Sequence, residues 1–179
     1  MLTDARKAEL LRLARESMTA QVLGRTPATA EQPLEVADAS GVFVTIKRRG
    51  ELRGCLGTLE CRGSLAEDVA RCARDSASRD PRFPPITRGE LPDLSIEISV
   101  LGPLELVDPE QPGAVVIGRH GLVVEVGSSR GLLLPQVAGE RSWTVGEFLE
   151  HTCRKAGLPP HAWKHGARVF RFDADVFGD

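Results

Sequence analysis

The stretch GVFVTIKRRGELRGCLGTLE, residues 41–60, predicts two β-strands joined by a tight turn. In its first half, Val42, Val44 and Ile46 occupy alternate positions, which is the period of a strand with one buried face. The segment RRGE, residues 48–51, supplies the turn. The second strand carries LRGCLG, residues 52–57, and this raises the question of whether Cys55 is a packing residue or a reactive thiolate.

A second stretch, LSIEISVLG at residues 94–102, is the clearest strand of the chain. Its apolar residues alternate with Ser95, Glu97 and Ser99. Such alternation indicates a sheet with one solvated face, which is typical of antiparallel pairing. Short strands with glycine turns at GRHG (118–121) and GSSRG (127–131), and a terminal strand over residues 167–177, extend the same pattern.

Helices are predicted between these strands. The first runs from about residue 4 to residue 22 after the N-cap Thr3, and an ordered loop follows over residues 24–40. Two more helices begin at the capping boxes Ser64–Glu67 and Thr144–Glu147, and the last of them ends at Gly157. Interleaved helices and hairpins predict an α+β fold, with a mainly antiparallel sheet flanked by helices. A single domain over residues 1–179 is expected, with or without a smaller lobe.

The composition excludes several classes of protein. The net charge of −2 argues against broad nucleic-acid binding, which needs a concentrated basic surface. No apolar run is long enough to span a membrane, and the first residues lack the pattern of a signal peptide, so a cytoplasmic location is expected. The four cysteines show no zinc-site spacing, so free thiols are predicted, and no metal site is expected unless the fold gathers distant residues. The sequence leaves the cofactor unknown.

The segment LRGCLG contains the main candidate site. Strand alternation places Arg53, Cys55 and Gly57 on one face, while the two leucines are expected to meet the core. A guanidinium beside a thiol favours the reactive thiolate, which makes Cys55 the candidate nucleophile. Alternatively, Cys55 is a buried structural residue, and Arg53 is a surface charge or forms a salt bridge with Glu51 or Glu60. Gly54 and Gly57 allow close approach of a ligand or of another backbone.

The segment DPRFP, residues 80–84, is the second candidate. Asp80 and Phe83 each precede a proline and are therefore biased toward extended backbone, so the loop can present Arg82 in a fixed direction. Together, Arg82 and Arg53 would suit a small anionic ligand with a carboxylate or phosphate group. Alternatively, Asp80 and Arg82 fasten the loop to the sheet, and Phe83 fills the core.

Two further residues are weaker candidates. His120, in the predicted GRHG turn, would act as a base toward Cys55 if the fold brings the two together. The alternative, an exposed turn histidine, is the more common case. Gln136 follows Pro135 at the predicted end of a strand and would place an amide in a cleft.

The motif LRGCLG resembles the LRGC-[IL]-G signature of the AMMECR family, whose microbial members are called AmmeMemoRadiSam system protein A. DPRFPPIT (80–87), LPDLSIEISVLGPLE (91–105), GRHGLVVEVGSSRGLLLPQVA (118–138) and FLEHTCRKAGLPPHAW (148–163) resemble the family in the same order. The resemblance implies an α+β domain with a smaller lobe and a cleft lined by the signature. It also implies partnership with a Memo-like protein and a radical-SAM protein, and it brings no settled reaction.

Three functions are therefore compared. In the first, Cys55 and Arg53 form the site of an enzyme that modifies a substrate, with a lowered Cys55 pKa. In the second, the same segment belongs to a non-catalytic module that binds a small molecule or a partner protein. The third, a nucleic-acid regulator, is the weakest, because the chain lacks a basic strand studded with aromatic residues. Whether the chain is an enzyme is left open by the sequence.

Overall fold

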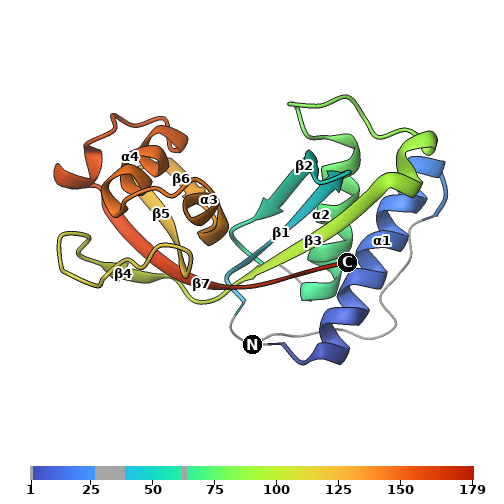
Figure 1. Ribbon diagram of the computed structural model, residues 1–179, viewed down its shortest axis with the longest axis horizontal. Helices are drawn as coiled ribbons and strands as arrows, with labels where there is room; N and C mark the ends of the chain where they lie inside the picture. Colours follow the sequence, from blue (N-terminus) through green and yellow to red (C-terminus); the bar gives the residue numbers. More distant parts are fainter. Residues whose placement is uncertain (1, 27–38, 62–63) are drawn as a thin grey trace. The chain divides into compact units, whose positions relative to one another are not determined.

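The computed structural model describes residues 2–26, 39–61 and 64–179, so most of the loop expected over residues 24–40 lies outside the described residues. The chain forms two compact units, Met1–Leu101 with Asp175–Asp179 and Gly102–Ala174 (Figure 1). Each unit combines helices with a sheet whose described registers are antiparallel. The predicted α+β class is confirmed.

The first unit contains the antiparallel strands β1 to β3 and, beside β3, the end of β7 (Arg168–Gly178), and two helices cover one face of the sheet. Its described elements are, in chain order, α1 (Asp4–Leu23), β1 (Gly41–Arg48), β2 (Glu51–Thr58), α2 (Leu65–Ser78), the 3-10 helix η1 (Arg88–Asp93) and β3 (Leu94–Leu101). β1 pairs with β2 on one side and with β3 on the other, and β2 is the end strand (Figure 1). Apolar side chains of α1 and α2 pack against Val44, Ile96 and their same-face neighbours.

The helix boundaries follow the capping signals of the sequence. At the start of α1, the hydroxyl of Thr3 accepts a hydrogen bond from the amide of Arg6. At its end, Gly24 adopts the left-handed conformation with φ 64°. Both bonds of the capping box at Ser64 and Glu67 are formed at the start of α2. The predicted first and second helices are therefore confirmed.

The hairpin between β1 and β2 is tight and contains an irregularity. Arg49 and Gly50 both have positive φ, 52° and 87°, as a two-residue turn matching the strand twist requires. The register shifts next to Ile46, which pairs with Gly54, so that Arg53 is the extra residue of a bulge. The bulge interrupts the alternation, and Leu52 is 42% exposed. The expectation that Leu52 meets the core is therefore wrong.

The second unit has its own hydrophobic core. Its described elements are β4 (Glu105–Val107), β5 (His120–Val126), β6 (Ser129–Leu133), α3 (Pro135–Glu140), α4 (Val145–Lys155), the 3-10 helix η2 (Ala162–Lys164) and most of β7 (Arg168–Gly178). β5 pairs with β6 and β7, and β4 pairs with β7. Apolar residues of α4, among them Phe148 and Leu149, pack on β5 and β7.

Three local predictions in this unit meet different outcomes. The turn between β5 and β6 confirms the hairpin at GSSRG. The prediction of a hairpin turn at GRHG is wrong, because the preceding strand, β4, ends at Val107 and pairs with β7 rather than with β5, and His120 is the first residue of β5. β6 ends at Leu133, and Pro135 and Gln136 follow it as the first residues of α3, where proline is favoured. Within the described residues, no helix is long and apolar enough to cross a bilayer.

Candidate functional site

Gly54 is the point where α2 touches the end strand. A β-carbon at this position would lie 2.2 Å from the carbonyl oxygen of Ser76, so only glycine allows this approach. The approach carries the buried Ser76 hydroxyl into the ladder between β1 and β2. This hydroxyl accepts the amide of Leu56 at 2.8 Å and donates to the carbonyl of Val44 at 2.7 Å. A helix side chain thereby links two paired residues of the strands.

Gly57 leaves room for an aromatic ring. It pairs with Phe43 across the ladder, and a β-carbon at position 57 would lie 2.4 Å from the ring of Phe43. The side chain of Phe43 therefore lies over the glycine, as aromatic residues opposite strand glycines do. Both glycines of the motif are thus explained by packing inside the first unit.

Cys55 lies on the face of the sheet that the helices leave uncovered, opposite Thr45 of β1. The Thr45 hydroxyl donates to the Cys55 sulfur at 3.2 Å. Burial raises the pKa of Cys55, and it outweighs the hydrogen bond from Thr45 and the charge of Arg82, which both lower it. The thiol is therefore mainly protonated at neutral pH, which is the unreactive form.

Asp80 and Arg82 hold the backbone of Cys55 from both sides. The carboxylate of Asp80 accepts the Cys55 amide at 2.8 Å, and the guanidinium of Arg82 donates to the Cys55 carbonyl at 3.1 Å. Arg82 also binds Asp80 at 2.7 Å, and this hydrogen bond lowers the pKa of Asp80 to about 2. The loop that contains Asp80 and Arg82 is thus fastened to the free edge of β2. These two side chains take up the hydrogen-bonding groups of Cys55 at that edge.

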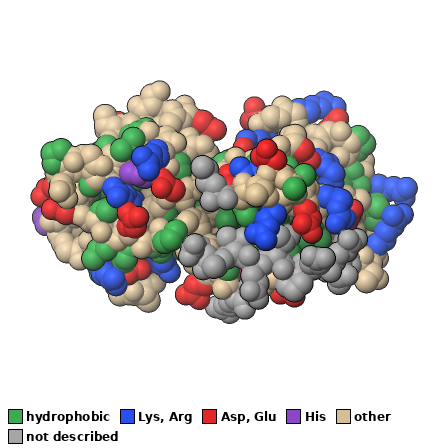
Figure 2. Space-filling model, turned by 90° about the horizontal axis from the view of Figure 1, so that it is seen from below, with side chains coloured by type: hydrophobic (Ala, Val, Ile, Leu, Met, Phe, Trp, Pro, Cys, Tyr) green, Lys and Arg blue, Asp and Glu red, His purple; other side chains and the backbone are tan. Residues whose placement is uncertain are grey.

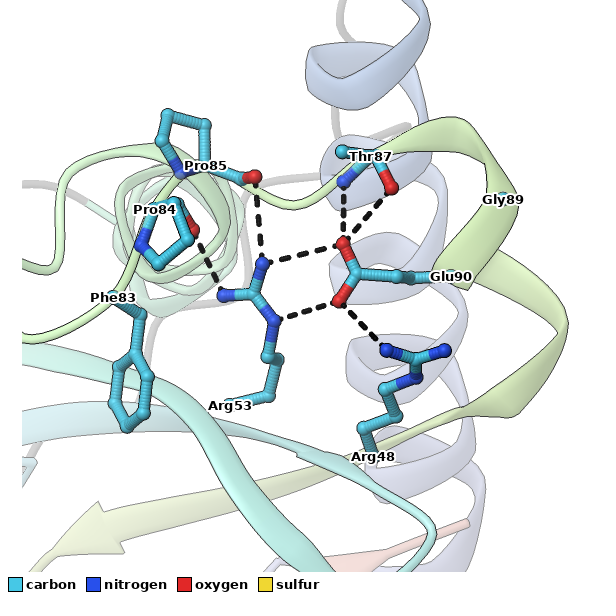
Figure 3. Close-up of a pocket in the computed structure, with 8 residues that line it drawn as sticks. All are labelled: Arg48, Arg53, Phe83, Pro84, Pro85, Thr87, Gly89 and Glu90. Atoms are coloured by element: carbon cyan, nitrogen blue, oxygen red, sulfur yellow. Dashed lines mark hydrogen bonds and ion pairs between the residues drawn. The ribbon is translucent and has the colours of Figure 1, made fainter.

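Arg53 is turned away from Cys55 and into the segment that precedes β3. Its guanidinium binds the carboxylate of Glu90 at 2.7 Å and 3.2 Å and donates to the carbonyls of Pro84 and Pro85 (Figure 3). The Arg53 side chain is only 13% exposed and that of Glu90 only 11%. The hydrogen bond from Arg53 lowers the pKa of Glu90 to about 2, so this carboxylate stays ionised.

The two arginines proposed to share an anion are therefore each paired with a carboxylate of the protein. Arg53 is neutralised by Glu90 and Arg82 by Asp80. Both guanidinium groups lie near the ring of Phe83, with the central carbons of Arg53 and Arg82 at 6.0 Å and 5.6 Å from the ring centre. This arrangement fixes the loop to the strand, and an added anion would have to compete with a bound carboxylate for either cation.

Glu90 and Ser76 are essential to this geometry, and sequence reasoning passed over both. Thr87 and Glu90 form a T-x-x-E capping box, the same pattern that identified two other helix starts, so Glu90 was detectable. Ser76 carries no comparable signal, because a serine inside a helix gives no sign that its hydroxyl reaches two strands.

His120 and Gln136 belong to the second unit. His120 is buried, and its Nδ1 accepts the amide of Val116 at 3.0 Å, while its Nε2 lies 3.8 Å from Asp173. Burial, followed by the positive charge of Arg171, lowers the pKa of His120. Gln136 is half-buried in the first turn of α3. The candidates brought together in the first unit are thus Arg53, Gly54, Cys55, Gly57 and Arg82.

The charge distribution offers no broad electrostatic site on the face drawn in Figure 2, where basic and acidic side chains are interspersed. Among the described residues, no three His, Cys, Asp or Glu side chains are grouped in a way that would hold a metal ion. The described cysteines, Cys55 included, are free thiols.

Comparison with known proteins gives consistent matches over most of the chain. The AMMECR1 family model matches residues 11–177. A protein of Methanosarcina acetivorans is 40% identical, covering 99% of this chain and 93% of its own length. A protein of Thermococcus onnurineus is 44% identical, with coverages of 94% and 87%. The crystal structure of the uncharacterised protein PH0010 from Pyrococcus horikoshii matches with a TM-score of 0.90, at 39% identity, over 99% of this chain and 93% of that one.

Proposed function

This chain belongs to the AMMECR1 family, and from the geometry of residues 53–57 we propose that it is a non-catalytic binding module. The recognition face is the helix-free side of the sheet in the first unit, where Lys47, Cys55 and Glu97 are partly exposed. A small molecule or a segment of a partner protein binds there, and Cys55 contributes shape and a hydrogen bond.

The state of the Cys55 thiol is the observation that carries this proposal. A nucleophilic cysteine needs a lowered pKa and a cation or base directed at its sulfur. Burial instead raises the pKa of Cys55, and Thr45 donates a hydrogen bond to the sulfur. The nearby Arg82 is bound to Asp80 and to the Cys55 carbonyl. These contacts support binding over thiolate chemistry.

A rigid backbone is the second support. The Cys55 amide and carbonyl are held by Asp80 and Arg82, and the Leu56 amide is held by Ser76. Binding costs less conformational entropy when the recognition segment is already ordered. Beside this segment, Lys47 pairs with Glu97 at 3.1 Å across the strands, and both side chains are partly exposed. The face therefore offers one charge of each sign to a ligand.

The partners are a Memo-like protein and a radical-SAM protein, the two classes that the family resemblance implies. Any radical chemistry would then belong to the partner, and this chain would supply recognition. The interspersed charges of the described surface favour a protein or small ligand over a nucleic acid, which would need a continuous basic stripe.

Binding measurements on matched variants test this proposal. The chain is titrated with a Memo-like protein and with a radical-SAM protein from the same organism, and affinities are compared for wild type, Cys55→Ser and Lys47→Ala. We expect Cys55→Ser to bind one partner within about twofold of wild type. Lys47→Ala should bind it about tenfold more weakly, as expected for loss of a charged contact. Lys7→Ala is the control, because Lys7 pairs with Asp175 but lies on α1.

Two results would overturn the proposal. One is that neither partner binds the wild-type chain. The other is that Cys55→Ser keeps its fold but abolishes function, while wild type forms a covalent adduct at Cys55 during the partner's reaction. The second result would establish the enzyme hypothesis in its place.

A further inference from the structure

A pocket of about 630 Å³ lies on the first unit, beside the bulge of β2 (Figure 3). Phe83, Pro84 and Pro85 form an apolar wall, while Arg48, Arg53 and Glu90 form the polar side. Figure 3 shows the guanidinium groups of Arg53 and Arg48 on two sides of the Glu90 carboxylate. The pocket thus combines an apolar surface with two cations and one anion.

The hydrogen bonds of Glu90 are satisfied without Arg48. One carboxylate oxygen accepts Arg53 at 2.7 Å. The other accepts Arg53 at 3.2 Å and Thr87 through its amide at 2.8 Å and its hydroxyl at 3.0 Å. Arg53 and Glu90 therefore form a nearly buried, neutral pair at the base of the pocket.

Arg48 makes much weaker contacts. It lies 3.5 Å from the nearer Glu90 oxygen and 3.6 Å from Asp93, and its side chain is 42% exposed. Both distances exceed those of a strong charge-assisted hydrogen bond, which are about 2.7–2.9 Å. Asp93 is held more closely by Arg49, at 3.0 Å. The side chains that line the pocket therefore carry a net charge of +1. This charge lies on the guanidinium of Arg48, which has N–H groups available to a ligand.

We propose that this pocket binds a carboxylate attached to an apolar group, with the carboxylate on Arg48 and the apolar group on Phe83, Pro84 and Pro85. A guanidinium matches a carboxylate with two parallel hydrogen bonds. A phosphate dianion fits less well, because the ionised Glu90 would repel its second charge. This site is separate from the recognition face around Cys55, so the inference does not depend on the proposed function.

Two sources can supply such a carboxylate, a free small acid or the C-terminus of a peptide that ends in an apolar residue. The wild-type protein is therefore titrated with 3-phenylpropionate and with an acetylated tripeptide ending in phenylalanine. The neutral 3-phenylpropionamide and phenyl phosphate are the control ligands. Binding is followed by the NMR signals of the arginine Nε–H groups and of the backbone amides of residues 83 and 86–90.

We expect at least one of the two carboxylates to bind with saturation and to shift the Arg48 signal, and the stronger of the two identifies the source. The amide should bind at least tenfold more weakly, because it cannot form the ionic hydrogen bonds. Arg48→Gln should weaken binding about tenfold. Arg49→Gln removes the same charge from a neighbour that does not line the pocket, and it should have little effect.

Three outcomes would overturn the inference. They are no saturable binding by either carboxylate, equal losses in Arg48→Gln and Arg49→Gln, and binding of the amide or of phenyl phosphate as strong as that of the acids. The ligand comparison uses only the wild-type chain, so it decides the question even if Arg48→Gln is poorly folded.

Discussion

A β-carbon on residue 54 would lie 2.2 Å from the carbonyl oxygen of Ser76, a contact with backbone that no side-chain rotation relieves. Gly54→Ala must therefore push α2 away from β2. We expect a loss of about 3 kcal/mol in the free energy of unfolding, at the upper end of ordinary overpacking. Urea unfolding followed by circular dichroism measures it.

Gly89→Ala is the matched control for this prediction. A β-carbon on Gly89 would meet no atom within 4 Å, and Gly89 does not adopt a positive φ. Its change in unfolding free energy should stay within about 0.5 kcal/mol of wild type. Similar losses in the two variants would contradict the packing role assigned to Gly54.

Ser76→Ala tests the hydroxyl that joins two strands. Its removal leaves the Leu56 amide and the Val44 carbonyl without the bonds it makes at 2.8 Å and 2.7 Å. We expect a destabilisation of about 2 kcal/mol and faster hydrogen exchange at the Leu56 amide. Ser78→Ala removes a bond to Arg74 within the same helix and should cost less. An unchanged exchange rate at Leu56 would rule out the bridge.

The sequence predicted the helices and strands better than it predicted the contacts between residues. Alternation in residues 94–102 and the capping boxes at Ser64 and Thr144 located β3, α2 and α4, because period and caps are local properties. The short elements β4 and α3 were missed, since three and six residues carry little periodicity. The predicted orientation of the Leu52 side chain was wrong because a bulge shifts the register between β1 and β2. The residue pattern does not indicate this bulge.

The pairings of the candidate site residues were not predicted from the sequence. Cys55 and Arg53 are two positions apart, which suggested a contact, yet Arg53 pairs with Glu90 and Cys55 with Thr45. Those partners come from segments 37 and 10 residues away, and their approach depends on tertiary packing. The alternative in which Asp80 and Arg82 fasten the loop to the sheet matches the observed hydrogen bonds.

The pair of Arg53 and Glu90 predicts a loss of stability in acid. The pKa of Glu90 is lowered from 4.5 to about 2, so the unfolded chain binds a proton that the folded chain does not between these values. The stabilisation is complete above about pH 5 and falls as the pH decreases toward 2. Glu90→Gln should be about 2 kcal/mol less stable at pH 7 and should lose less on acidification.

Urea unfolding between pH 7 and pH 3 measures both effects. Glu51→Gln, at an exposed position on β2, is the control and should follow wild type at every pH. A Glu90→Gln variant with the stability and pH dependence of wild type would show that the ion pair contributes nothing.

His120 should be neutral at pH 7, with its proton on Nε2. Its Nδ1 accepts the Val116 amide, and its burial disfavours the charged form and lowers its pKa. Long-range ¹H–¹⁵N NMR spectra distinguish the two tautomers, with the exposed His161 as an internal comparison. A proton on Nδ1, or a positive charge at pH 7, would contradict the hydrogen bond from Val116.

The central claim is that Cys55 is a protonated, packed thiol, and cysteine alkylation as a function of pH tests it most directly. The native chain is treated with iodoacetamide across a pH series, and each cysteine is followed by mass spectrometry, with Cys61, Cys72 and Cys153 as internal comparisons. Because burial raises the pKa of Cys55, we predict that Cys55 reacts slowly until the pH exceeds the pKa of an ordinary thiol, about 8.5. If Cys55 instead reacts fastest and titrates well below that value, it is a thiolate, and the binding-module account is wrong.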